Sequence, residues 1–229
     1  MAQATGNAKN ILVGASPLFL SNIDVTDTDY VENAEPGSAT AGAFASGVSY
    51  TSTLNAQDQT AGSMGYRNVG YTNNGLQITY NPTYDAVTVD QLLDSAKLFK
   101  SAMEVMIATE MSEGTLENVL VVFGQKSDTL TETGTGLTSK KTLGLEAGAL
   151  GAAPTERQLI AVGQAPTADA TATERVYYAR RVLSVQQSQF SLARNTPTTF
   201  PVTFRLLPSG DSAYAGQEYG KIIDRVLVA

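Results

Sequence analysis

Apolar and polar residues alternate with a period of two in several short segments, which is the pattern of half-buried β-strands. The alternation is clearest in residues 199–207, where Phe200, Val202, Phe204 and Leu206 share one face. The other strand-like segments are residues 11–20, 48–54, 66–71, 76–80, 119–123, 157–163, 176–185 and 221–228. These segments predict a fold of about eight to ten strands.

A turn signal separates two of these segments. Asn73, Asn74 and Gly75 stand between residues 66–71 and residues 76–80. An Asn-Gly pair between alternating apolar runs is a strong signal for a tight β-hairpin. We therefore expect these two segments to pair across a turn at 73–75.

One longer segment, residues 88–110, has apolar residues at helical spacing. Thr88 is a suitable N-cap, and Gln91 follows three residues later, at the capping-box spacing. Gly114 is a plausible helix stop. The apolar stripe comprises Val89, Leu92, Leu93, Ala96, Phe99, Met103, Met106 and Ile107. The spacing predicts a helix whose core residues Leu92, Phe99, Met103 and Met106 pack against a sheet.

The region around residues 23–65 differs from the rest of the chain. It is rich in Gly, Ala, Ser, Thr and Asp, and residues 34–65 contain no cation. Such a stretch has too few large apolar residues to fold alone, although residues 48–54 in its middle have a strand-like pattern. We expect a flexible excursion from the domain.

These elements predict a fold that is mainly β with one α-helix. We expect a β-sandwich or barrel-like domain with the helix packed at its side and with long loop or hairpin excursions. The 229 residues suit a single domain, residues 1–229, closed by a C-terminal strand at 221–228.

The residue types that are missing restrict the chemistry. The chain has no Cys and no His, so disulfides, thiolate catalysis and the commonest general base are excluded. Only 16% of the residues are charged, below the usual quarter. A sparsely charged surface favours a protein that is largely covered by partners.

No motif indicates an enzyme, a cofactor or a metal. The chain lacks a nucleophile elbow and a phosphate-binding loop. The nearest approach to a metal site is the acidic group Asp24, Asp27, Asp29 and Glu32, whose oxygens suit Ca²⁺. The EF-hand spacing is absent, so we favour a solvated acidic loop over a cation site in residues 24–35. A pair of carboxylates for glycoside hydrolysis stays open as an alternative.

The charge and hydropathy of the chain indicate whether nucleic acids or membranes are expected partners. The net charge is −7, and no dense basic run with aromatic residues occurs, so attractive nucleic-acid binding is not expected. The first two thirds are acidic, whereas residues 157–229 hold eight cations and five anions. Residues 11–20 are too short to span a membrane and lack the flanks of a secretory signal. We expect no membrane association and no export.

Three segments resemble the major tail proteins of long, flexible-tailed bacteriophages. They are the opening ILVGASPLFLSN at 11–22, the segment at 88–110, and the closing block at 175–212, in which an alternating Phe/Val strand ends in a Leu-Pro turn. The resemblance extends over most of the chain in layout, but no short motif is diagnostic.

The resemblance implies a structural virion protein rather than an enzyme. In that family six copies form a ring, sheets of neighbouring copies join into an inner barrel, and rings stack into a tail tube through which DNA is ejected. Expected partners are other copies, tape-measure and tail-tip or terminator proteins, and DNA that passes without specific binding. The location would be the virion tail, after synthesis in the bacterial cytoplasm. Contact between rings would involve Gly42, Phe44, Val48, Tyr50 and Leu54.

A different class stays open as well. An extracellular β-sandwich module for recognition or adhesion would also have strands rich in Gly, Thr and Ser. Such a module would need an export signal, which the sequence does not display.

Overall fold

The computed structural model describes residues 14, 16–28, 30, 65–166, 173–186, 188–192, 194–195 and 197–226. Within these residues the protein is mainly β with one α-helix, as predicted. The strands are β1 (Leu18–Ser21), β2 (Tyr66–Asn68), β3 (Thr72–Val87), β4 (Lys97–Met111), β5 (Leu130–Thr133), β6 (Lys140–Leu143), β7 (Arg157–Gln164), β8 (Thr173–Ser184), β9 (Phe200–Leu206) and β10 (Gly220–Val226). The helix is α2 (Leu116–Val122).

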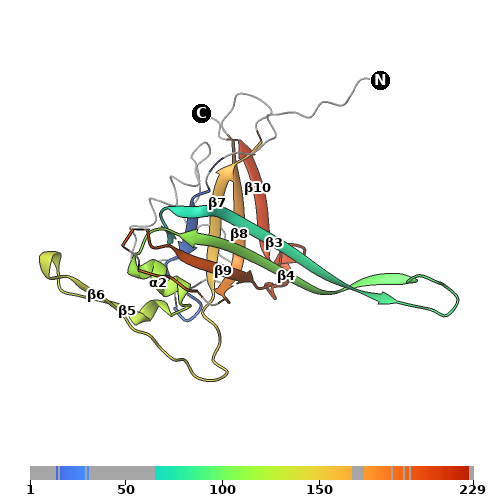
Figure 1. The fold of residues 1–229 in the computed structure, drawn as a ribbon, viewed down its shortest axis with the longest axis horizontal. Helices are drawn as coiled ribbons and strands as arrows, with labels where there is room; N and C mark the ends of the chain where they lie inside the picture. The colour runs from blue at the N-terminus through green and yellow to red at the C-terminus, as the bar shows by residue number, and fades with distance from the viewer. Residues whose placement is uncertain are drawn as a thin grey trace.

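All the described strands except β5 and β6 belong to one antiparallel sheet, in the order β2-β1-β7-β8-β9-β4-β3. Strand β8 joins its two parts. Residues 173–179 of β8 pair with β10, and residues 182–184 pair with β9. Figure 1 shows β7, β8 and β10 running across the direction of β3, β4 and β9. The sheet is therefore folded over at β8 into the sandwich-like arrangement expected from the sequence.

The main core lies between the two parts of the folded sheet. Alternate residues of β1, β7 and β8 face alternate residues of β4 and β9, and α2 closes one side. Phe204, Met111 and Leu159 are among its fully buried side chains. A second cluster on the other face of the sheet contains Phe19, Ile160 and Tyr178. Burial on both faces explains why residues 157–162 are all buried and why residues 159–162 form a continuous apolar run.

The predicted helix over residues 88–110 is wrong. Residues 97–111 form strand β4, and Thr88 lies in the connection between β3 and β4. The apolar residues of this segment fit both the helical period of 3.6 and the strand period of two. The buried residues Val105, Ile107 and Met111 follow the strand period. β-branched residues favour the strand, and pairing with the long strand β3 decides between the two periods.

The actual helix lies where a buried strand was expected. Residues 119–122 form the end of α2, and Phe123 is its C-cap. The prediction failed because a short apolar run has no periodicity that separates a strand from a helix. The helix begins at the N-cap Thr115, whose side chain accepts a hydrogen bond from the amide of Asn118. It ends at Gly124, which has φ +63°, and Gln125 N donates to Leu120 O. This pairing is a Schellman cap, which requires a left-handed residue at the position of Gly124.

The turn expected at residues 73–75 is a bulge inside β3. Asn74 and Gly75 have φ values of 61° and 67°, and the pairing of β3 with β4 shifts between Asn73 and Gln77. The expected partner segment, residues 66–71, supplies β2, which pairs with β1 instead. Residues with a left-handed backbone occur in β-bulges as well as in turns, so the Asn-Gly pair did not determine which strands pair.

The other predicted strands within the described residues are confirmed at 157–163, 176–185, 199–207 and 221–226, and Leu18–Leu20 confirms the end of the 11–20 segment. The strand expected at 48–54 lies outside the described residues. No helix in the described part of the chain is long and apolar enough to cross a membrane.

The corrected fold predicts unequal effects for two phenylalanines. Phe99→Ala should change the free energy of unfolding of the unassembled protein by no more than about 1 kcal/mol, because Phe99 lies on the exposed end of β4. Phe204→Ala should cost about 3–5 kcal/mol, because this side chain is fully buried. Urea denaturation of both variants measures the difference, and equal losses would contradict the position assigned to Phe99.

Candidate assembly surface

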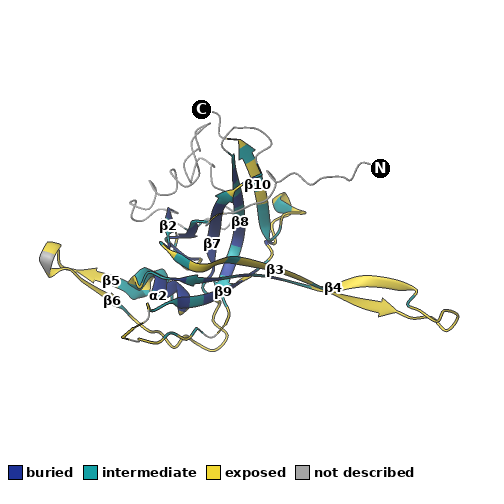
Figure 2. Ribbon diagram, turned by 45° about the horizontal axis from the view of Figure 1, so that its top comes forward, coloured by how far each residue is buried: buried dark blue, intermediate teal, exposed yellow. Residues whose placement is uncertain are grey.

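Strands β3 and β4 form a hairpin that projects from the body of the protein. The strands have 16 and 15 residues and stay paired from Thr72 and Met111 to Val87 and Lys97. Figure 1 shows the hairpin continuing past the core, and Figure 2 shows its distal half coloured as exposed, in agreement with exposure at successive residues of both strands. A ladder of this length is about 50 Å long at 3.3 Å per residue.

The exposed part of the hairpin is unusually apolar. Ile78 and Tyr80 lie on the core-facing side of β3, directly opposite the buried Ile107 and Val105 of β4, but they are themselves exposed. The exposed large apolar residues of the two strands and their connection are Ile78, Tyr80, Tyr84, Val87, Val89, Leu92, Leu93, Leu98 and Phe99. Single exposed apolar residues are normal, but a group of them on one protrusion is typical of interaction surfaces.

The four residues predicted as a helix core lie in or next to this hairpin. Leu92 is 57% exposed and Phe99 is 47% exposed, so neither is a core residue of this chain. Met103 and Met106 are half-buried on opposite faces of β4. The prediction of a core helix was therefore wrong in structure, and it was wrong in burial for Leu92 and Phe99, whereas Met103 packs against the core. The predicted contact residues Gly42, Phe44, Val48, Tyr50 and Leu54 lie outside the described residues.

An apolar groove adjoins the base of the hairpin. Its volume is about 380 Å³, and its walls come from β3, β4, β8, β9 and β10 and the segment before β10. Ile78 and Tyr80 line one side, and Tyr177, Tyr219 and Ile222 line the other. Ile222 is 65% exposed, so the groove is open to solvent. Sequence reasoning missed this groove, since it combines residues from five strands.

Charged groups border the groove. Lys221 lines it, and the ammonium of Lys100 lies 5.8 Å from the ring centroid of Tyr80. Arg175 holds β10 against β8 by donating two hydrogen bonds of 2.6 Å to the carboxylate of Asp224. The bond from Arg175 lowers the pKa of Asp224. Because this ion pair is exposed, it contributes little to the free energy of unfolding, although it links β10 to β8.

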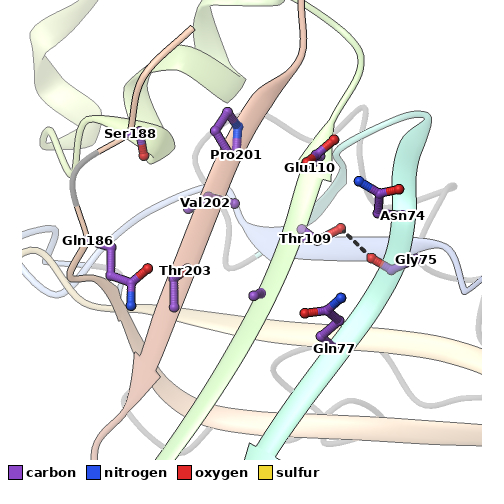
Figure 3. Close-up of a pocket in the computed structure, with 11 residues that line it drawn as sticks. Asn74, Gly75, Gln77, Thr109, Glu110, Gln186, Ser188, Pro201, Val202 and Thr203 are labelled. Carbon is purple, nitrogen blue, oxygen red and sulfur yellow. Dashed lines mark hydrogen bonds between the residues drawn. The ribbon is translucent and has the colours of Figure 1, made fainter.

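The opposite face of β3, β4 and β9 has a different character. Figure 3 shows a shallow polar groove there, with a volume of about 180 Å³. Gln77, Gln186 and Thr203 present amides and a hydroxyl, and Thr109 Oγ1 donates to Gly75 O at 2.9 Å. Glu110 is the one residue with a titratable side chain among those that line this groove. The lining offers hydrogen bonds but no pairing of a nucleophile with a base.

The acidic group expected to be a solvated loop is partly buried. Asp24 is fully buried and accepts hydrogen bonds from Thr26, from Ser127 and from Arg157, whose Nη2 lies 3.3 Å away. Arg157 also donates to Ser21 O and Asn22 O. This network joins β1, β7 and the segment after α2. It contradicts the solvated-loop interpretation for Asp24, while Asp29 and Glu32 lie outside the described residues.

The burial of this ion pair affects both partners. Burial raises the pKa of Asp24, but the hydrogen bonds from Ser127 and Thr26 outweigh it, so the pKa is lowered overall. Burial lowers the pKa of Arg157 to about 10, against the opposing effect of the Asp24 carboxylate. Both groups are therefore charged near neutral pH. No group of three or more metal-ligating side chains occurs among the described residues.

No protein-family model and no curated protein matches the sequence. Inferences about function therefore depend on the surfaces of the protein itself.

The buried pair predicts an acid-dependent loss of stability. Asp24→Asn should lower the free energy of unfolding at pH 7 by about 3–5 kcal/mol, because it leaves the buried Arg157 charge without its carboxylate. Because the pKa of Asp24 is lowered on folding, the Asp24 contribution is complete above the ordinary value of 3.8 and is lost as the pH falls through the folded-state value.

Chemical denaturation between pH 7 and pH 3 tests this effect. The difference between wild type and Asp24→Asn should shrink below pH 3.8. Asp128→Asn, an exposed carboxylate in the neighbouring 3-10 turn, is the matched control and should change stability by less than about 0.5 kcal/mol. A difference between wild type and Asp24→Asn that stayed constant with pH would contradict the assigned ionic role.

Proposed function

We propose that this protein is a structural subunit that assembles with copies of itself into stacked rings, as the tail tube of a long-tailed bacteriophage. The observation that carries the proposal is the β3–β4 hairpin, whose exposed half bears large apolar side chains. Such a surface is unfavourable in water and becomes favourable once another protein covers it.

Two further features support a subunit of an assembly. The low content of charged residues gives little protection against self-association. The outer edges of β3 and β10 have no strand partner among the described residues, so each offers a row of backbone donors and acceptors. Strand addition at such edges is a common mode of protein association.

The proposed tube also fits the acidic net charge of the chain. The net charge is −7, and several arginines are already engaged by carboxylates, as in Arg181 with Glu156 and Arg225 with Glu174. DNA held by many free cations would be retained through counterion release. A subunit with an acidic net charge would let DNA pass without specific binding.

The adhesion-module alternative has no comparable support. The exposed apolar residues extend along a hairpin of about 50 Å, which suits contact with another subunit. We therefore favour self-assembly.

The proposal predicts that polar hairpin variants stay folded but do not assemble. The double variant Tyr84→Ser and Leu98→Ser removes two exposed apolar side chains outside the core, so the far-ultraviolet circular dichroism of the subunit should not change. Light scattering should show only the unassembled protein, and negative-stain electron microscopy should show no rings or tubes. Wild type should form them at high concentration.

The matched control is Leu145→Ser with Leu150→Ser, which changes two exposed leucines outside the hairpin. This control should assemble like wild type. Normal tubes from the Tyr84 and Leu98 variant would remove the role given to the hairpin. A wild-type protein that stayed monomeric at all concentrations, with and without its virion partners, would overturn the proposed function.

A further inference from the structure

A β-bulge divides the β3–β4 hairpin into a half near the core and a distal half. Thr83 pairs with Ala102, but the next residue of β3, Tyr84, pairs with Lys100, so no residue of β3 lies opposite Ser101. One extra residue on one strand of a pair is a β-bulge, which bends that strand and increases the local right-handed twist. The bulge therefore affects the direction in which the rest of the hairpin projects.

The side chains confirm the extra residue. Tyr80 lines the apolar groove on the core-facing side of β3, and the ammonium of Lys100 lies 5.8 Å from the centroid of its ring. Val105 of β4 lines the same groove, and strict alternation from Val105 would place Lys100 on the opposite side of the hairpin. The bulge at Ser101 shifts the alternation by one residue and brings Lys100 to the side of Tyr80.

The pairing of the strands is fixed on both sides of the bulge. Near the core, Val105 is buried between the two parts of the sheet. At the other end, the amide of Ala96 donates to Val87 O at 2.8 Å and closes the connection between the strands. Beyond the core, β4 uses one residue more than β3 to reach this connection. The bulge at Ser101 accommodates that residue.

The two halves of the hairpin differ in the side chains that they expose. Before the bulge, the side of β3 that faces away from the core is polar and comprises Gln77, Thr79, Asn81 and Thr83. Beyond the bulge, large apolar residues are exposed on both sides, with Tyr84 and Leu98 on one side and Val87 and Phe99 on the other. The orientation of the distal half therefore determines where two apolar surfaces point.

We propose that the bulge at Ser101 orients the distal half of the hairpin so that its apolar residues meet neighbouring subunits in one geometry. This inference deepens the proposed function and depends on it, since the surface being oriented is the one through which copies assemble. The bulge lies beyond the buried residues of β4, so core packing does not account for it. The hydroxyl of Ser101 donates to Thr83 O at 3.4 Å, which is a long and weak hydrogen bond, so the side chain does not account for it either.

Deletion of Ser101 tests the proposal. The deletion removes the bulge and keeps the other pairs, because Lys100 then follows Ala102 directly and still lies opposite Tyr84. The far-ultraviolet circular dichroism and the urea midpoint of the unassembled subunit should stay as in wild type. Light scattering and negative-stain electron microscopy should show that regular tubes are lost, or that they need a protein concentration about ten-fold higher or more.

Two controls separate the bulge from other effects of the deletion. Ser101→Ala keeps the extra residue and loses only the hydroxyl, so it should assemble like wild type. Deletion of Ala147, an exposed residue between β6 and β7, shortens the chain by the same amount outside the hairpin and should also assemble like wild type.

The orientation itself can be measured in the unassembled subunit, because the natural chain contains no Cys. Leu98→Cys on the distal half and Ile222→Cys on β10 are both at exposed positions and can carry spin labels. Electron paramagnetic resonance then gives the distribution of distances between the labels. Deletion of Ser101 should shift this distribution, whereas Ser101→Ala should leave it unchanged.

Each outcome separates this inference from the proposed function. Normal tubes from the deletion variant, or an unchanged distance between the labels, would overturn the inference and leave the tube proposal standing. Assembly of the deletion variant at a lower concentration than wild type would also overturn it, because the bulge would then restrict pairing at the exposed edge of the hairpin. An unfolded deletion variant would show that the core depends on the bulge and would overturn the orienting role. A wild-type protein that forms no tubes would overturn the proposed function and this inference together.

Discussion

The ladder between β3 and β4 continues beyond the core that stabilises its first half, and the main features of this protein depend on that continuation. At the base, Val105, Ile107 and Met111 are buried between the two parts of the sheet. Beyond them the same face of the hairpin has no core to cover it. A two-stranded ribbon alone is marginally stable in water. The exposed half is therefore held by its anchored base, and an assembly would add the contacts that this half lacks.

A rigid base is necessary if the hairpin is to meet a partner in one orientation. Several polar contacts fix the elements around the base. Asn118 of α2 donates to Val69 O and Glu113 O, and its side-chain oxygen accepts from Arg67. The Asp24 and Arg157 pair fixes the segment after α2 against β7. A buried ion pair often contributes little net stability compared with apolar packing, but it permits few alternative arrangements.

Much of the sheet could be predicted from the sequence, because the alternation of buried and exposed residues along a strand can be recognised from that strand's own residues. Strand β9 is the clearest case, with Phe200, Val202, Phe204 and Leu206 on its buried face. The residues of one strand do not determine which other strand it pairs with. Asn74 and Gly75, which predicted a turn, form a bulge. The apolar run at residues 119–123, which predicted a buried strand, belongs to the helix α2 and its C-cap. The bulge was decided by pairing with β4, which is distant in sequence, whereas α2 is bounded by the local caps at Thr115 and Gly124, which the apolar run alone does not include.

The candidate surface could be predicted only in part, and for an instructive reason. The apolar stripe in residues 88–110 was interpreted as a surface that faces the core of its own chain. An apolar pattern indicates that a surface is to be covered, but it does not indicate which molecule covers it. Leu92 and Phe99 are exposed here although their spacing is that of buried residues. The same composition that favoured an internal helix is the composition needed at a contact between subunits. The error about the helix and the proposal about assembly therefore have one physical origin, which is apolar surface that the chain itself does not bury.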